Sequence, residues 1–501
     1  MPSQAQAPTS QHMSRYHNEV VKIDTTASPN DVTAKLLTSL LNTHYKIMNL
    51  HSKDIQVASF QWQPLGRGFM SNVQLLTVCY ETDYLHSTAT GGVTRPDMPP
   101  NNMQPQFLAK FRKEEIPLED LFSVEGQFYQ LARELFASDS KVSCESANKF
   151  PFRLVDAIAT GPSWLLLEYI PPENMIIIDV HEGCPPDRFD DLLVRLARMH
   201  ATCWVSNTTS ESSKESTSIS SILKKHALKL SPTPGAGHSL PPSIRQEQFQ
   251  ASWPAVRERL IPYFQSDEGV KSLGRMDQTV SWTAQSPRIE EIAQSVAERK
   301  YTVVHGDFHI GNMLLQKTQT NNDEEMKHPM PWLVDWSMAG IGNPCVDLVF
   351  FLVVGADAIP IHEISSSTDV ASSQSTNATA TEHVRLILEQ YYQALTSETQ
   401  VEDATNEPSN APSQSSQHPL LPWETFLTMF SQCLLNQFII LACYDSLCRS
   451  MADASPISQL YHDHFDRVNT RCVRMLLSEY GMTRFFNIKN GSEDNPCHIQ
   501  A

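Results

Sequence analysis

The sequence predicts an α+β protein with two lobes, a small β-rich N-lobe and a larger helical C-lobe. Three observations predict this class. Short runs typical of strands are concentrated before residue 170, helical periodicity dominates after it, and the turn Pro171-Pro172 separates the two regions. Hydrophobic residues make up 41% of the 501 residues, which is enough for a substantial core.

The N-lobe is expected to be a small antiparallel sheet that carries a single helix. Residues 31–50 have apolar side chains at helical spacing and predict an amphipathic helix ahead of the sheet. The predicted strands are 55–62, 73–80, 107–111 and 163–170. A helix is expected at 120–136, before the last of these strands. Strands with one inserted helix favour an α+β lobe.

The C-lobe is expected to be mainly helical. The predicted helices are 187–204, 382–395, 422–448 and 456–480. Two short strand-like runs, 301–304 and 332–334, lead into turns that carry acidic residues. No internal repeat is visible in the sequence.

Polar segments of low apolar content set the predicted domain boundaries. Residues 1–30 are expected to be a disordered N-terminus, 31–170 the N-lobe, 171–490 the C-lobe and 491–501 a tail. Within the C-lobe, the Ser-, Pro- and Gly-rich stretches at 206–243 and the polar stretches at 363–381 and 396–419 predict insertions, the latter two disordered.

Composition excludes several classes of partner. The chain has 38 Lys and Arg against 56 Asp and Glu, a net charge of −18, which argues against nucleic acid and anionic membranes as partners. The uncharged stretch 425–444 is about long enough to span a bilayer. Polar residues in its middle, such as Asn436 and Gln437, favour a buried helix instead, so no membrane span is expected.

A cytoplasmic location is expected. The N-terminus lacks the apolar region of a secretory signal. The ten cysteines form no C-x-x-C pair, so they predict neither a zinc ribbon nor a thioredoxin-type site, and most are interpreted as reduced core residues.

The strongest chemical signal is YTVVHGDFHIGNMLL at 301–315, followed by PWLVDWSMAGIGNPCVDLVFFLV at 331–353. Three oxygen-bearing side chains stand out, namely Asp307, Asn312 and Asp335. Mg²⁺ prefers such oxygen ligands and binds through one or two carboxylates plus substrate phosphates. Phosphoryl transfer to a hydroxyl requires such ions and a further carboxylate to receive the hydroxyl proton.

These motifs resemble those of the aminoglycoside phosphotransferase and choline-kinase superfamily of small-molecule kinases, which has a bilobal protein-kinase-like fold. HGDFHIGN is similar to its H-G-D-x-x-x-x-N catalytic loop and is nearest to the aminoglycoside phosphotransferases, whereas DLVFFL resembles the ecdysteroid-kinase-like branch. The sequence does not decide between the branches. Protein kinases carry D-F-G where this chain has Asp335-Trp336-Ser337, which favours small-molecule kinases.

The resemblance implies a role for each matching residue. Asp307 would be the catalytic base, and Asn312 and Asp335 would hold Mg²⁺ against the phosphates of ATP. His305 would pack the loop, and Asp347 would brace it from the following helix.

A nucleotide lid is expected between the first two strands. Gly66, Gly68 and Ser71 lie there in the order G-x-G-x-x-S, and small residues let a hairpin backbone approach phosphates. An ordinary hairpin turn is the alternative interpretation.

The resemblance also implies a lysine, a glutamate and a hinge. Lys110 in FLAKFRK would contact the α- and β-phosphates, with Arg112 and Lys113 as alternatives. Glu125 in the predicted helix would pair with it, with Glu134 as the alternative. Main-chain groups of Glu168 and Ile170 would read the adenine edge.

The predicted function is ATP- and Mg²⁺-dependent phosphorylation of a hydroxyl on a small-molecule acceptor. One rival is a metal-dependent hydrolase that uses His305, Asp307 and His309 as ligands, although this leaves Asn312 and Asp335 without a role. Another is a non-catalytic kinase-like protein that binds a nucleotide or a partner. The segment HDHFD at 462–466 could suit a cationic acceptor, although a solvated helix face is the plainer interpretation. The sequence does not specify the acceptor or the oligomeric state.

Overall fold

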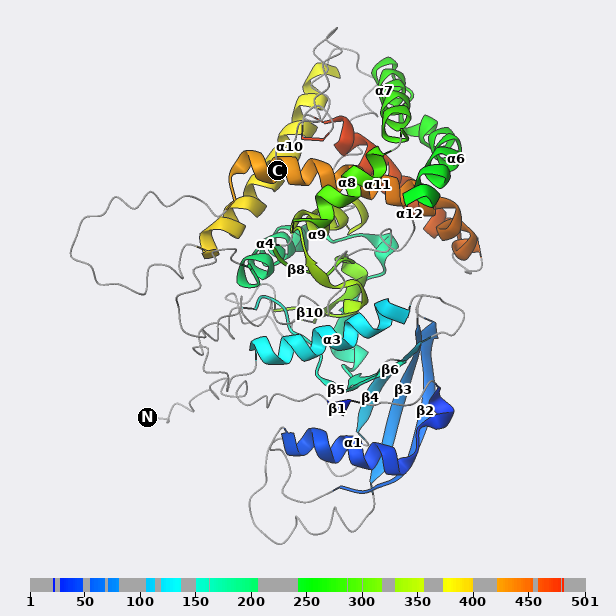
Figure 1. Cartoon of the computed structure of the whole chain (residues 1–501), viewed down its shortest axis with the longest axis vertical. Helices are drawn as coiled ribbons and strands as arrows, with labels where there is room; N and C mark the ends of the chain where they lie inside the picture. Colours follow the sequence, from blue (N-terminus) through cyan, green and yellow to red (C-terminus); the bar gives the residue numbers. More distant parts are fainter. Residues whose placement is uncertain are drawn as a thin grey trace, which may run out of the picture. The chain divides into compact units, whose positions relative to one another are not determined.

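The structure is a computed structural model (Figure 1). It describes residues 21–22, 28–47, 55–67, 71–80, 105–112, 119–136, 150–161, 163–205, 242–285, 287–299, 301–317, 329–355, 373–399, 421–453, 458–478 and 480–481. The chain divides into two compact units. The first comprises Met1–Glu173 and Asn207–Ser231, and the second comprises Asn174–Ser206 and Pro232–Ala501.

The first unit contains a six-stranded sheet of order β1-β5-β6-β4-β3-β2. Its strands are β1 (Val21–Lys22), β2 (Val57–Arg67), β3 (Ser71–Tyr80), β4 (Gln106–Arg112), β5 (Ala157–Thr160) and β6 (Trp164–Glu168). All neighbouring strands pair antiparallel except β1 and β5, which are parallel. The predicted antiparallel sheet is therefore confirmed, and four of its strands lie where the sequence placed them.

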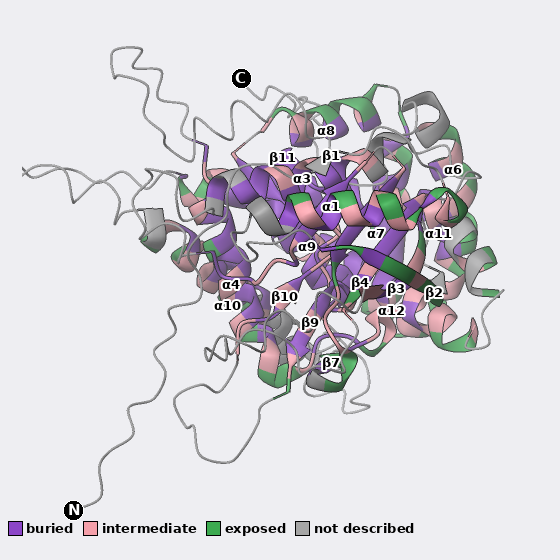
Figure 2. Ribbon diagram, turned by 90° about the horizontal axis from the view of Figure 1, so that it is seen from below, coloured by how far each residue is buried: buried purple, intermediate pink, exposed green. Residues whose placement is uncertain are grey.

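Helix α1 (Ala34–Ile47) covers this sheet with one apolar face. Leu37, Leu40 and Leu41 are buried in the same core as strand residues, while the opposite side of the helix is exposed (Figure 2). Burial of each such leucine contributes about 2 kcal/mol. Within the sheet, the rings of Phe111 and Trp164 stack at 5.7 Å, which joins β4 to β6.

Helix α3 (Glu119–Phe136) packs closely against β5. Gly126 makes this possible, because a Cβ atom there would lie 3.2 Å from Thr160 Cβ. Gln130 then donates from Nε2 to Thr160 Oγ1 at 3.0 Å. Neither β5 nor β1 was predicted. The strand at Val21–Lys22 corrects the expectation of disorder over 1–30, because pairing with β5 orders two residues of that segment.

The second unit is mainly helical, in agreement with the sequence prediction. Its helices are α4 (Pro186–Thr202), α6 (Pro242–Leu260), α7 (Asp267–Thr283), α8 (Arg288–Ala297), α9 (Cys345–Phe350), α10 (Ser373–Thr399), α11 (Trp423–Asp453) and α12 (Ser458–Leu477). Two small sheets accompany them. β7 (Met175–Ile177), β9 (Met313–Gln316) and β10 (Trp332–Leu333) form one, and β8 (Thr302–Val304) pairs with β11 (Gly340–Gly342) in the other.

Helix α11 is the apolar segment that raised the question of a membrane span. Among the described residues, Trp423–Ser446 is the one helix long and apolar enough to cross a bilayer, and 83% of its most apolar window is buried. The polar residues in its middle are buried as well, and Ser431 Oγ donates to Leu427 O at 2.9 Å and to Tyr480 O at 2.6 Å. This burial agrees with the expected core helix.

The helical prediction needs correction at α10, and α6, α7 and α8 were not among the predicted helices. The stretches 363–381 and 396–419 were expected to be disordered, yet α10 runs from Ser373 to Thr399 and so includes part of both. The buried half of α10 is stabilised by packing and nucleates the helix. Extending the helix by a further residue then adds one backbone hydrogen bond at a small cost in conformational entropy. The insertion at 206–243 lies almost wholly outside the described residues.

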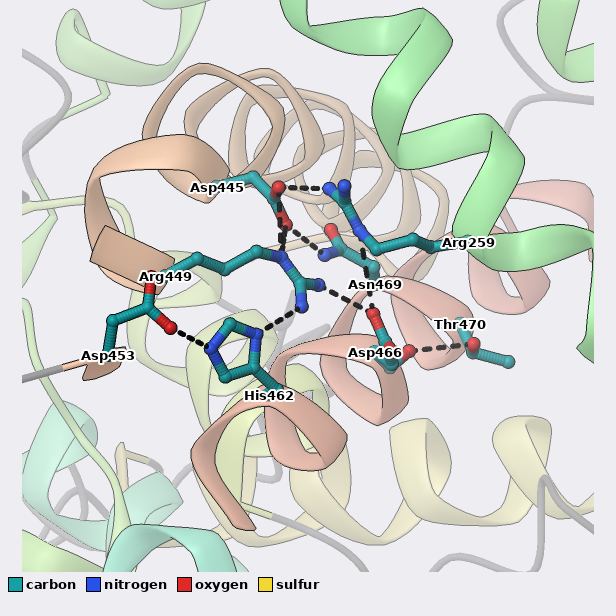
Figure 3. Close-up of polar contacts among 8 residues, drawn as sticks. All are labelled: Arg259, Asp445, Arg449, Asp453, His462, Asp466, Asn469 and Thr470. Atoms are coloured by element: carbon teal, nitrogen blue, oxygen red, sulfur yellow. Dashed lines mark hydrogen bonds and ion pairs between the residues drawn. The ribbon is translucent and has the colours of Figure 1, made fainter. Parts of the chain in front are cut away.

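Ion pairs join α6, α11 and α12 (Figure 3). Arg449 donates from Nε to both carboxylate oxygens of Asp445 at 3.1 Å and from Nη2 to Asp466 Oδ1 at 2.5 Å. Arg259 of α6 binds Asp445 and lies 3.7 Å from Asp466. Asp466 belongs to the HDHFD segment, so this acid is paired with arginines of the same unit rather than open to a cationic ligand.

Candidate active site

The first unit contains a buried ion pair between β4 and α3. Lys110 Nζ lies 2.9 Å from Glu125 Oε1 and 3.0 Å from Oε2, and the two side chains are 11% and 2% exposed. Tyr129 donates from its hydroxyl to Glu125 Oε1 at 3.4 Å. The structure thus brings together the lysine and the glutamate that the sequence singled out. Of the alternatives, Lys113 and the side chain of Glu134 lie outside the described residues.

The strand register relates the β2–β3 hairpin to this lysine. Gly66 pairs with Val73, and Val73 pairs with Lys110 on the next strand. Directly paired residues place their side chains on the same face, so the hairpin end that carries Gly66 is two strands from Lys110. Ser71 begins β3 and is buried, and Gly68 lies outside the described residues.

The predicted hinge residues follow at the end of β6. The backbone N–H of Glu168 donates to Asp156 O at 2.8 Å, so this N–H is not available to a ligand. The exposed Glu168 side chain also accepts from Asp156 N at 3.3 Å. Ile170 is half-buried and lies just beyond the strand.

In the second unit, β8 ends in a tight turn that requires glycine. Gly306 has φ of 80°, and a Cβ atom there would overlap the backbone carbonyl of Met338. Because β8 pairs with β11, which begins two residues after Met338, the turn is pressed against the start of its partner strand. Asp307 follows directly.

His305 links this turn to the segment that carries Asp335. Its Nδ1 accepts from the backbone N–H of Asp307 at 3.3 Å, and its Nε2 lies 3.0 Å from the carbonyl oxygen of Val334. Nε2 must therefore carry the proton, and the ring is neutral. Burial agrees with this assignment, because it lowers the pKa of His305 despite the nearby Asp347 and Asp307 carboxylates. His305 has the structural role expected of it.

Asp307 is the one acidic residue of the loop 305–312, and its side chain is 31% exposed. Asn312 donates from Nδ2 to the backbone oxygen of Asp307 at 2.9 Å and to Asp307 Oδ2 at 3.0 Å. His309 Nε2 lies 3.5 Å from Oδ1. Burial alone would raise the pKa of Asp307, but the neighbouring His309 and the Asn312 amide lower it to about 2. The carboxylate is ionised at neutral pH.

The Asn312 and Asp335 side chains suit a hard cation. Asn312 donates from Nδ2 to Asp307, and these hydrogen bonds fix the orientation of its side-chain amide, including Oδ1. Mg²⁺ prefers neutral or anionic oxygen ligands of this kind. Val334 N donates to Asn312 O at 3.0 Å, which ties the Asp335 segment to the loop. Asp335 itself has φ of 63° and ψ of 63°, a left-handed conformation that aspartate tolerates better than most residues.

The rival metal site of His305, Asp307 and His309 is not supported. His305 uses both ring nitrogens for backbone groups, and His309 Nδ1 accepts from Gly311 N at 3.0 Å. No cluster of three or more His, Cys, Asp or Glu side chains able to hold a metal occurs in the part of the chain that the structure describes.

Asp347 anchors the turn from α9, as the sequence analysis expected. Its Oδ2 accepts from His305 N and its Oδ1 from Gly306 N, both at 2.7 Å. His200 of α4 approaches Oδ2 with its Nε2 at 3.1 Å, and Tyr391 of α10 contacts the other ring nitrogen. Tyr391 carries no local signal in the sequence, because nothing distinguishes it from its neighbour Tyr392.

Comparison with known proteins agrees with the motifs. The sequence profile of the Ecdysteroid kinase-like family matches residues 104–358, just over half of the chain. A search of curated proteins found no match.

Solved structures of small-molecule kinases show a distant likeness. The choline kinase LicA of Streptococcus pneumoniae is 12% identical, with a TM-score of 0.34, over 86% of this chain and 97% of that one. Plasmodium vivax ethanolamine kinase is 9% identical, with a TM-score of 0.32, over 88% and 89%. An aminoglycoside phosphotransferase of Alicyclobacillus acidocaldarius is 11% identical, with a TM-score of 0.32, over 84% and 93%. All three TM-scores are below 0.5.

Proposed function

Because the chain belongs to the Ecdysteroid kinase-like family, we propose that it transfers the γ-phosphoryl group of ATP to a hydroxyl of a small molecule. One observation carries the proposal. The Asp307 carboxylate is accessible and ionised, and the Asn312 amide that holds it belongs to the same loop to which the Asp335 segment is hydrogen-bonded.

The proposal includes a bilobal protein-kinase-like architecture, with an N-lobe at 31–170 and a C-lobe at 171–490. In this architecture the Lys110–Glu125 pair and the Asp307 loop serve one nucleotide. Lys110 would bind the α- and β-phosphates, and Glu125 would hold its ammonium in place. The Gly66–Ser71 hairpin would cover the phosphates with its backbone, and the main-chain carbonyl of Glu168 and the main chain of Ile170 would bind the adenine.

Asn312 and Asp335 are the residues that would hold Mg²⁺. When bound, the metal ion neutralises charge on the phosphate oxygens and orients them. The chain contributes the anchoring of both ligands, through Asn312 Nδ2 to Asp307 and through Val334 N to Asn312 O.

Asp307 would bind the acceptor hydroxyl and receive its proton. The hydroxyl oxygen bonds to the γ-phosphorus, the bond from that phosphorus to the bridging oxygen of ADP breaks, and the proton moves to the carboxylate. With a pKa of about 2, Asp307 is a weak base, so it would orient the hydroxyl early and accept the proton late. This order suits a loose transition state, in which positioning matters more than proton abstraction.

Thermal denaturation with ATP, with and without Mg²⁺, tests the nucleotide site. We expect ATP to stabilise the protein, and to do so more strongly with Mg²⁺. The Asp335→Asn variant should keep the stabilisation by ATP alone and lose the part that depends on the metal. The absence of any stabilisation would favour a non-catalytic kinase-like protein.

A screen for ATP consumption across amino alcohols, sterols, sugars and antibiotics tests the activity itself. The proposal predicts turnover with at least one hydroxyl compound and none with the matching compound that lacks the hydroxyl. ADP formed at the same rate with and without every acceptor would contradict it.

A further inference from the structure

We propose that Tyr391 is a positioning residue for the catalytic loop and acts by fixing the tautomer of His200. The inference rests on the proposed function, since it concerns how Asp307 is held. Helix α10, which carries none of the motif residues, would then also hold the catalytic loop in place.

Three buried side chains form a continuous relay from α10 to the backbone of the loop. The Tyr391 hydroxyl lies 2.5 Å from His200 Nδ1, and His200 Nε2 lies 3.1 Å from Asp347 Oδ2. Asp347 accepts the backbone N–H groups of His305 and Gly306. The side chains of His200, Asp347 and Tyr391 are all 0% exposed, so none of these polar groups can use bulk water instead.

The contacts define the direction of every hydrogen bond. Within the described residues, His200 Nδ1 is the one partner of the Tyr391 hydroxyl, so the hydroxyl hydrogen must be donated to Nδ1. Nδ1 then has no proton, and the ring proton is on Nε2, where it is donated to Asp347. Tyr391 can only donate while it keeps its proton, and burial together with the nearby Asp347 carboxylate raises its pKa well above the usual value.

The opposite tautomer would disturb the loop. With the proton on Nδ1, the lone pair of Nε2 would face the Asp347 carboxylate, and Asp347 would lose one of its three donors. Asp347 could then restore its hydrogen bonding only by turning, which would move the His305 and Gly306 amides directly before Asp307. Tyr391 excludes this state because its hydroxyl requires an acceptor at Nδ1.

The backbone of α4 is also tied to the loop. Thr302 of β8 donates from Oγ1 to His200 O at 2.7 Å, so His200 is held at both its carbonyl and its ring. This second tie keeps the histidine in place when the tyrosine hydroxyl is removed. The Tyr391→Phe variant therefore removes the hydrogen bond at His200 Nδ1 without releasing the helix.

The test compares Tyr391→Phe with Tyr392→Phe in the full chain. Tyr392 is the matched control, because its hydroxyl donates to Leu421 O at 2.6 Å, outside the relay. We expect kcat of Tyr391→Phe to fall about tenfold with the KM for ATP nearly unchanged, since a buried acceptor loses its donor. Tyr392→Phe should keep the wild-type kcat.

Nitrogen NMR of protein labelled at histidine reads the tautomer without any substrate. We expect one buried histidine with a protonated Nε2 and an unprotonated Nδ1 whose Nδ1 resonance moves in Tyr391→Phe and not in Tyr392→Phe. A protonated Nδ1 in the wild type would overturn the inference. An Nδ1 resonance or a kcat that stays unchanged in Tyr391→Phe would overturn it as well. Because the NMR result needs no acceptor, it tests the relay even if the wild type transfers no phosphate and the proposed function fails.

Discussion

Lys110 and Glu125 form a two-point ion pair, with Nζ at 2.9 Å from Oε1 and 3.0 Å from Oε2. The Glu125 carboxylate is almost fully buried, and the Lys110 ammonium compensates its charge. The stabilising role of this pair and its proposed role in nucleotide binding can be separated by mutation.

Replacing Lys110 with Met should destabilise the protein by about 3–5 kcal/mol, because it leaves a buried carboxylate without its cation. The double variant Lys110→Met/Glu125→Leu should recover most of that loss, since neither charge remains. Urea denaturation measures both changes. If the pair also serves ATP, the double variant should be folded but should no longer be stabilised by the nucleotide. Full stabilisation by ATP in the double variant would remove Lys110 from the nucleotide site.

Gly306→Ala should destabilise the protein by about 2 kcal/mol or more, because alanine disfavours a φ of 80° and its Cβ would overlap a backbone oxygen. Gly274→Ala is the control. Gly274 lies inside α7 with no heavy atom within 4 Å of an added Cβ, so alanine there should stabilise by about 0.5–1 kcal/mol. Equal denaturation midpoints for the two variants would contradict the described turn.

The ionisation of Asp307 gives a pH prediction. Its pKa is lowered from 3.8 to about 2, so the ionised form contributes stability that is present above pH 3.8 and lost as the pH falls through 2. The stability difference between the wild type and Asp307→Asn should therefore stay constant from about pH 5.5 to 4.5 and shrink only below about pH 4. Urea denaturation at each pH measures it, and a difference that already shrinks at pH 5 would mean that the pKa is not lowered.

The ion pairs of Figure 3 should stabilise the helical unit, because Asp445 is only 5% exposed. Arg449→Met should cost about 3 kcal/mol, since Asp445 and Asp466 both lose a cation. Lys271→Met is the control, because the Lys271–Glu268 pair is at the surface and spans 3.8 Å, and its loss should cost less than about 1 kcal/mol. If Arg449→Met lowers the free energy of unfolding by as little as Lys271→Met, the ion pairs add no stability.

The sequence predicted the elements and residues whose signal is local. The H-G-D turn, the apolar strand around Lys110 and the periodic helices are each visible within about fifteen residues, and the structure has an element at each of these places. β5 was missed because its four residues are all buried and show no alternation, and β1 because two residues carry no pattern.

Contacts between distant segments could not be predicted. Tyr391 is 191 residues from His200, and one tyrosine of two on a helix carries no sign of its partner. The acids of HDHFD look like a solvated face until α6 and α11 place Arg259 and Arg449 against Asp466. Such pairings depend on the packing of whole helices, which a single sequence does not encode in any short pattern.

The central claim is that Asp307 acts on the acceptor hydroxyl rather than on the nucleotide. Transfer of labelled γ-phosphate from ATP to an acceptor, measured together with ATP affinity, tests it most directly in Asp307→Asn. The claim predicts that transfer is abolished while the affinity for ATP stays close to that of the wild type. Full transfer activity in Asp307→Asn would contradict it.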